Sequence, residues 1–244
     1  MQHFESARGD VAALASSSER TAFLRRTYTV LGIALLGWVG LTAGMMTLTP
    51  ELSLSWSQMA MGGRWSWLLV MGAFMAVGYA AERMARSNTS QGVQLAGLAL
   101  FVVAQSLIVQ PMLWIAIAMG TKSGNFDPQT TIMQAAGITG VVFVGLTSIV
   151  FITKKDFSFM RGVLTVLSFA ALGIIILSLI FGFNLGTLFS GAMVALMAGY
   201  ILFQTSMVMQ TFPTNHHVAA ALMLFSTIAT LFWYVLRLLM ESRR

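Results

Sequence analysis

Seven long apolar runs, separated by short polar segments, make up most of the chain. A helix needs roughly 20 apolar residues to cross a bilayer. Each run is close to that length, and the acidic residues fall in the tails, in the polar segments or at the end of a run. The pattern predicts an all-α polytopic membrane protein, a seven-transmembrane-helix bundle within residues 24–240, preceded by an N-terminal tail over residues 1–23. The predicted spans are residues 27–48, 65–82, 92–118, 130–152, 161–182, 186–209 and 218–239.

Turn-forming residues mark the short polar segments, so consecutive helices should pack as antiparallel hairpins. Pro111 interrupts the third run and should kink it, and Gln105 and Gln110 need hydrogen-bond partners away from lipid. Such a helix could line a cavity or form a packing joint. Small residues also recur at four-residue spacing, which favours close helix contacts within the bundle. These sets are Gly40 with Gly44, Gly72 with Ala76 and Ala80, and Ala195 with Gly199.

Composition and charge agree with a membrane protein. Hydrophobic residues make up 57% of the chain and charged residues only 9%, whereas soluble domains carry roughly 25% charged residues. The net charge of +6 does not indicate nucleic-acid binding, because the basic residues flank the apolar runs as topology determinants do. A cytoplasmic N-terminus places nine of the 14 basic residues inside and five outside, and is therefore favoured. A re-entrant last run would return the C-terminal arginines to the inside, but the charge-free residues 218–236 favour a full crossing.

Few side chains suggest chemistry. The absence of cysteine excludes disulfides and thiolate catalysis. No nucleophile, base or metal constellation is visible, so the sequence predicts neither an enzyme nor a cofactor. His216 and His217 would point in different directions on a helix and are expected to be solvated loop residues. Glu82 ends the second run and is the candidate internal acid; the alternative is an interfacial cap formed with Arg83 and Arg86.

Four motifs occur in order along the chain. They are Arg26-Thr27-Tyr28 at the start of the first span, QPML at residues 110–113, ITKKDFSFM at residues 152–160, and ILFQTS at residues 201–206 followed by Thr214 and Asn215. With them, residues 20–240 resemble the Bax inhibitor-1 family, and specifically its bacterial YccA-like branch. The resemblance implies a bundle whose last helix is central and surrounded by the other six.

The resemblance also identifies a candidate polar pair. Calcium-leak members of the family use two aspartates, in the sixth and seventh helices, as a pH-sensitive latch. Gln204 and Thr227 occupy the corresponding positions here. Neither side chain ionises, so protonation cannot open such a latch. We expect the two residues to be joined by a hydrogen bond. A cation leak channel for calcium or protons, lacking the di-acidic latch, remains the alternative function.

The YccA-like branch implies a different activity. Its members resemble substrates and competitive inhibitors of the membrane AAA protease FtsH, which grips a cytoplasmic N-terminal tail and pulls the protein from the lipid bilayer. The bacterial inner (cytoplasmic) membrane is therefore the expected location. The candidate protease-engaged residues are Met1, Ser16, Ser17 and Ser18, because the serines and Gly9 disfavour a stable helix.

Overall fold

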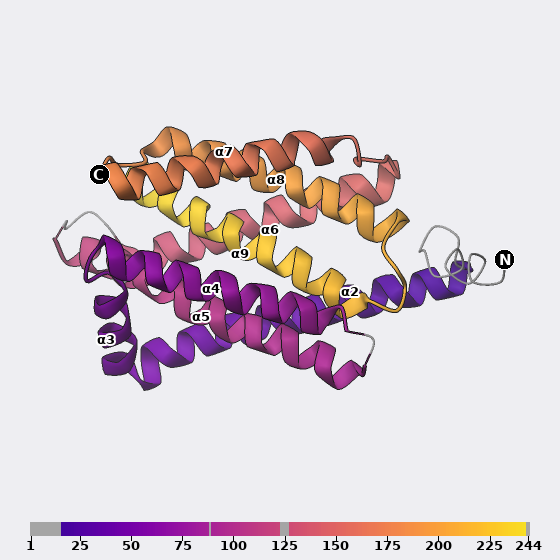
Figure 1. Ribbon diagram of the computed structural model, residues 1–244, viewed down its shortest axis with the longest axis horizontal. Helices are drawn as coiled ribbons and strands as arrows, with labels where there is room; N and C mark the ends of the chain where they lie inside the picture. Colours follow the sequence, from indigo (N-terminus) through magenta and orange to yellow (C-terminus); the bar gives the residue numbers. More distant parts are fainter. Residues whose placement is uncertain (1–15, 88, 123–126, 243–244) are drawn as a thin grey trace.

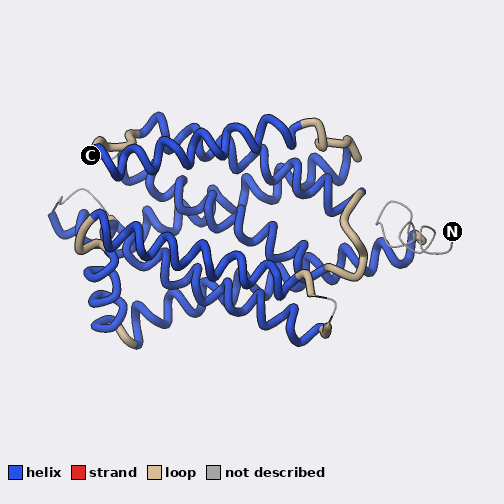
Figure 2. The backbone as a smooth tube through the Cα atoms, viewed as in Figure 1, coloured by secondary structure: helices blue, strands red, loops and turns tan. Residues whose placement is uncertain are grey.

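Seven membrane-length helices and one shorter helix form a single bundle (Figures 1 and 2). The computed structural model describes residues 16–87, 89–122 and 127–242, and every regular element in these ranges is an α-helix. The predicted number of spans is confirmed, because seven of the helices in these ranges are long and apolar enough to cross a membrane. The helices are α2 (Ser17–Leu48), α3 (Pro50–Ala60), α4 (Arg64–Ala85), α5 (Gln91–Lys122), α6 (Pro128–Thr153), α7 (Met160–Phe181), α8 (Thr187–Gln210) and α9 (His217–Ser242).

Helix α9 forms the centre of the bundle, as the resemblance implies. It runs diagonally through the middle of Figure 1 and packs against α2, α4, α5, α6 and α8. Its most apolar stretch is 78% buried, against 11% for that of α7. The expectation that all six other spans surround it needs one correction, because α7 packs mainly on the outer side of α8. Lipid tails thus face α7, while α9 is surrounded almost entirely by protein.

Helix α2 begins ten residues earlier than the first predicted span. Ser16 is its N-cap: the Ser16 hydroxyl accepts from the Glu19 amide at 3.3 Å, and the Ser16 amide donates to the Glu19 carboxylate at 3.1 Å. This reciprocal capping box starts a helix. The prediction that Ser16, Ser17 and Ser18 disfavour a helix is therefore wrong, because Ser17 and Ser18 form its first turn. Met1 lies outside the described residues.

Helix α3 was not predicted, although it follows directly from the turn at Thr49 and Pro50. Pro50 occupies the first helical position, where its missing N–H costs nothing. The Ser53 hydroxyl donates to the Gln110 side-chain carbonyl at 2.7 Å and accepts from the Trp114 indole at 2.8 Å. Gln110 is fully buried, and its amide nitrogen donates to the Thr42 carbonyl at 3.3 Å. Its predicted need for partners away from lipid is met by α2 and α3.

Pro111 lies inside α5 without ending the helix. Proline lacks the N–H that would bond the carbonyl four residues earlier, that of Leu107, and within a bilayer a free carbonyl is costly. The Trp56 indole of α3 donates to this carbonyl at 2.9 Å. Helix α3 therefore supplies the hydrogen bond that Pro111 removes, which makes this region a packing joint.

Replacing Trp56 with phenylalanine should lower the free energy of unfolding by about 1 kcal/mol, since an aromatic ring remains and one hydrogen bond to a carbonyl within the bundle is lost. In a Pro111→Ala background, Trp56→Phe should lower the free energy of unfolding by less, because the new alanine has a backbone amide that can itself donate to the Leu107 carbonyl. Unfolding in mixed micelles measures this double-mutant cycle. Equal costs in both backgrounds would contradict the proposed link between Trp56 and Pro111.

Two of the three predicted small-residue contacts are absent. Gly40, Gly72, Ala76 and Ala80 lie on exposed surfaces of the bundle, and a Cβ atom built on Gly40 or Gly72 would meet nothing within 4 Å. Gly199 does pack closely, since its Cβ would lie 3.0 Å from a methyl group of Leu164. The four-residue spacing identifies a helix face but does not say whether protein or lipid covers it.

Candidate functional site

The predicted polar pair is present between the two most buried helices. The Thr227 hydroxyl of α9 donates to the Gln204 side-chain carbonyl of α8 at 2.8 Å. The exposed fractions of the two residues are 7% for Gln204 and 5% for Thr227. Both side chains are neutral, so the bond joins α8 to α9 without an ionic interaction. The expected hydrogen bond is present, while the correspondence of the two positions to the acidic latch of calcium-leak members stays a prediction from the resemblance.

Two of the sequence motifs meet next to this pair. Ser206, two residues after Gln204 and almost fully buried, accepts a hydrogen bond from the Phe157 amide at 3.0 Å. The same hydroxyl lies 3.4 Å from the Lys155 carbonyl and 3.5 Å from the Asp156 carboxylate. The loop between α6 and α7 is thereby fixed to α8, which explains why residues 152–160 and 201–206 form one structural unit.

Hydrogen bonds from Ser158 favour the charged form of Asp156 in this loop. The Ser158 amide and then the Ser158 hydroxyl donate to its carboxylate, at 2.8 and 2.9 Å, and these bonds hold its pKa below its usual range. A carboxylate with a lowered pKa contributes its stabilisation at all pH values above its unfolded pKa and loses it only as the pH falls through the folded pKa. The loop therefore keeps its charge at neutral and mildly acidic pH.

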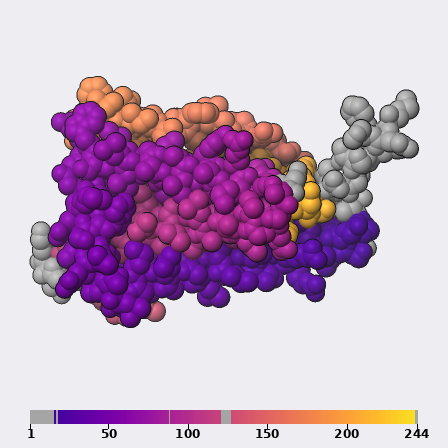
Figure 3. All heavy atoms as spheres, turned by 60° about the horizontal axis from the view of Figure 1, so that its bottom comes forward, coloured from indigo at the N-terminus to yellow at the C-terminus, as the bar shows by residue number. Residues whose placement is uncertain are grey.

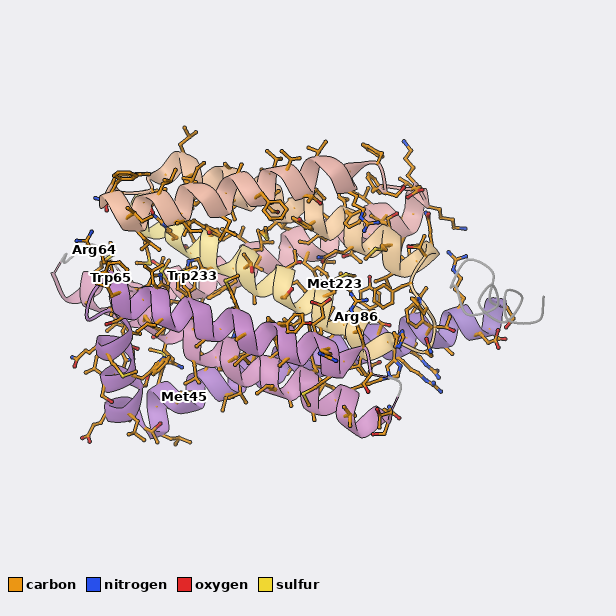
Figure 4. The ribbon with its side chains drawn as sticks, in the orientation of Figure 1. Met45, Arg64, Trp65, Arg86, Met223 and Trp233 are labelled. Carbon is orange, nitrogen blue, oxygen red and sulfur yellow. The ribbon has the colours of Figure 1, made fainter. Side chains whose placement is uncertain are left out.

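A cavity of about 820 Å³ occupies the opposite end of the bundle, where α4 starts and α9 ends. Its walls come from α4, α5, α7, α9 and the segment between α7 and α8. Trp67 and Trp233 stack across it with their ring centroids 6.1 Å apart, and Figure 4 shows Arg64 and Trp233 at this end. Gln105 and Thr230 contribute polar groups to the lining, so Gln105 faces a cavity.

Among the acidic residues that the structure describes, Glu241 is the one that is partly buried. The sequence placed it only at a helix end. Its side chain is 17% exposed and accepts from the Arg237 guanidinium at 2.8 Å and from the Ser190 hydroxyl at 3.1 Å. The Arg237 Nη2 atom also donates to the Leu185 carbonyl. Arg237, assigned by sequence to topology alone, thus connects the end of α9 to α8 and the segment before it.

Glu82 is not an internal acid. Its side chain is 53% exposed and accepts a hydrogen bond from Arg86, one turn later, at 3.0 Å. Arg86 in turn lies over the Phe212 ring at 5.8 Å. This geometry fits the alternative interpretation, an interfacial cap at the end of α4, because long side chains at a span end reach toward the headgroups.

The prediction of two solvated loop histidines is wrong for His217. This residue opens α9, is only 8% exposed and lines a pocket together with residues of α2. The first residue of a helix that packs into the centre of the bundle can be buried, although the residues just before it in the sequence are polar. Among the residues that the structure describes, no three His, Asp or Glu side chains come together as metal ligands.

In the described part of the chain, seven helices are long and apolar enough to cross a membrane, and the last of them is buried in the bundle and joined to α8 by a hydrogen bond. These features define a polytopic integral membrane protein. A family model described as "Inhibitor of apoptosis-promoting Bax1" matches residues 20–244, nearly the whole chain. The chain belongs to the Bax inhibitor-1 family.

Relatives come from bacteria and from yeast. The chain is 30% identical over 160 residues to an uncharacterized membrane protein of Vibrio cholerae, covering 59% of this chain and 70% of that protein. It is 29% identical to Bax inhibitor 1 of Schizosaccharomyces pombe, over 92% of this chain and 78% of that protein. An uncharacterized protein of Neisseria meningitidis serogroup A shares 25% identity over 93% of this chain and 94% of its own length.

Proposed function

We propose that this protein resides in the bacterial inner membrane with its N-terminus in the cytoplasm, and modulates the membrane AAA protease FtsH as a slowly extracted, competing substrate. The resemblance to the YccA-like branch motivates this proposal. The observation that carries it is the anchoring of α2 to the centre of the bundle. A protease that pulls from the N-terminus would load α2 before any other helix.

The anchor is a set of contacts between α2, α5 and α9. Trp38 of α2 packs edge-on against Phe225 and Phe232 of α9, with ring centroids 5.8 and 5.5 Å apart. Leu31, two turns earlier, is 1% exposed. Because α9 is itself surrounded by four further helices, pulling on α2 stresses the most constrained part of the fold first. Extraction should therefore be slow.

Access for a protease is provided by the other end of the same helix. The first turns of α2 extend beyond the rest of the bundle (Figures 1 and 3). Residues 1–15 precede the N-cap Ser16. A segment ahead of a capped, projecting helix can be gripped without first disturbing the membrane-embedded contacts.

Deleting residues 2–15 should lengthen the lifetime of the protein in cells, because a processive protease needs a segment to engage. The deletion stops before Ser16, since a longer one would remove the capping box and change α2 itself. Arg20, Arg25 and Arg26 remain to set the topology. Pulse-chase decay measures the lifetime, and affinity purification from native membranes identifies a bound protease.

A scrambled version of residues 2–15 is the matched control, because it keeps length and composition and should be degraded like the full-length protein. Insertion is checked by membrane fractionation. Equal decay of the deleted and full-length proteins, together with no co-purifying membrane protease, would eliminate the proposal.

A cation leak is the second candidate, favoured by one observation. The large cavity extends from the mouth at Arg64 to Thr230, which lies one turn along α9 from Thr227. A cation path that enters through this cavity and is closed by the Gln204–Thr227 hydrogen bond would have this arrangement. Such a path would not respond to protonation, because neither residue ionises.

Protein reconstituted in liposomes is therefore expected to show no calcium flux that changes between acidic and neutral pH. A fluorescent calcium indicator inside the liposomes measures the flux, and an ionophore confirms that the indicator responds. A clear pH-dependent flux would favour the channel over the protease modulator and would require a titrating group elsewhere in the bundle.

A further inference from the structure

A second, smaller pocket lies at the end of the bundle where α2 and α9 begin. Its volume is about 460 Å³. Helix α2 contributes Arg25, Arg26, Thr29 and Val30, while Gln91 and His217 are the first residues of α5 and α9. Three helices therefore meet at a pocket whose lining, as far as the structure describes it, is mostly polar and includes no acidic residue.

The two helix starts give the pocket a positive potential before any side chain is considered. The first turn of a helix has backbone N–H groups without intrahelical partners, and its dipole favours anions. In α5 the Ser90 hydroxyl accepts from the Val93 amide at 3.3 Å, which satisfies one of these donors. Helix α9 opens directly at the pocket with His217.

The charged side chains add to this potential instead of neutralising it. Within the described part of the chain, the ion pairs are Glu82 with Arg86 and Arg237 with Glu241, so Arg25 and Arg26 are not paired there. Both arginines are exposed at the mouth of the pocket. Their guanidinium groups can reach an anion in the pocket from the headgroup side.

The side chain of His217 is a second, independent indication of an anion site. It is buried, with an exposed fraction of 8%, lines the pocket, and makes no hydrogen bond to any described residue. The ring nitrogens of His217 are not enclosed by protein, so a ligand in the pocket can reach them. A bound anion would supply a hydrogen-bond partner, and an imidazole N–H can donate to it.

We propose that this pocket binds a phosphate group, held by Arg25, Arg26, His217 and the start of α9. Planar guanidinium groups bind phosphate oxygens in pairs, which suits two adjacent arginines. The pocket lies near one end of three helices that are long and apolar enough to cross a membrane. Lipid headgroups are expected at the ends of such helices, so an anionic phospholipid can present its phosphate there. A free phosphate ion offers the same chemistry. The site does not depend on the protease proposal.

The test uses the full-length protein in detergent, titrated with dihexanoyl phosphatidic acid, with inorganic phosphate, and with dihexanoyl phosphatidylcholine as the zwitterionic comparison. Binding is read from the shift of the thermal unfolding midpoint and from native mass spectrometry. Wild type should bind phosphatidic acid more tightly than phosphatidylcholine. Displacement of the lipid by inorganic phosphate would show that the pocket takes the free ion too; binding of the lipid alone would identify the headgroup as the ligand.

The Arg25→Gln/Arg26→Gln variant should weaken phosphatidic acid binding by at least about tenfold, the loss expected for one charge-assisted hydrogen bond. Lys155→Gln/Arg161→Gln is the matched control, because it removes two exposed positive charges outside the pocket and should leave binding within about twofold. A His217→Gln variant tests the buried donor, and circular dichroism checks that each variant folds. The site would be overturned if Lys155→Gln/Arg161→Gln weakened phosphatidic acid binding as much as Arg25→Gln/Arg26→Gln. It would also be overturned if wild type did not prefer the anionic lipid.

Discussion

Truncating Trp38 to alanine is expected to lower the free energy of unfolding by about 3 kcal/mol, the lower end of the range for a buried tryptophan. The lower end applies because lipid tails, unlike water, solvate apolar side chains, so only packing contacts are lost. These are the edge-on contacts with Phe225 and Phe232 of the central helix. Under the proposed function the same variant should be extracted and degraded faster than wild type. Unfolding in mixed micelles and pulse-chase decay measure the two effects.

Two controls separate packing from other properties of tryptophan. Trp38→Phe keeps a ring and removes an indole N–H that has no hydrogen-bond partner in the described residues, so its cost should be much smaller. Trp65→Ala removes a 72% exposed side chain and should change the free energy of unfolding by less than about 0.5 kcal/mol. If Trp65→Ala were as destabilising as Trp38→Ala, the anchoring of α2 to α9 would not explain the effect.

Replacing Gly97 with alanine should destabilise the bundle by about 1–3 kcal/mol, the usual cost of overpacking. Helix α5 approaches α4 so closely here that the added Cβ would lie 2.6 Å from the Ala81 carbonyl oxygen and 2.7 Å from the Met84 Cβ. Backbone atoms cannot move aside as a flexible side chain can. The two helices must separate, and thermal unfolding in detergent should show the loss.

Gly72→Ala is the matched control for this variant. Gly72 lies in α4, and a Cβ atom there meets nothing within 4 Å. Alanine has the higher helix propensity, so this change should be neutral or slightly stabilising. Equal destabilisation by both changes would show that the Gly97 contact is not specific.

Hydrophobic run length was sufficient to predict the spans, because a bilayer imposes one length on every helix that crosses it. Contacts between different spans were harder to predict from the sequence. The Gln204–Thr227 hydrogen bond could be expected only through the family resemblance, since no spacing rule relates a residue of α8 to one of α9. The contact of Ser206 with the loop at Phe157 could not be expected in the same way.

Two other features could have been predicted from local sequence motifs, but the prediction relied on the apolar runs. The spacing of Ser16 and Glu19 is that of a capping box, yet the serine run suggested an irregular tail. Pro50 at the start of an 11-residue amphipathic stretch marks α3 in the same way. By contrast, nothing in the sequence distinguishes Gly97, which packs against α4, from Gly72, which faces outward. Which face of a helix is covered depends on tertiary packing.

The most direct test of the proposed function is the degradation rate of a reference membrane substrate by purified FtsH in proteoliposomes, measured with and without this protein. Full-length protein should slow degradation of the reference substrate, Trp38→Ala should slow it less, and the variant lacking residues 2–15 should have no effect. An unchanged rate in the presence of the full-length protein would contradict the account.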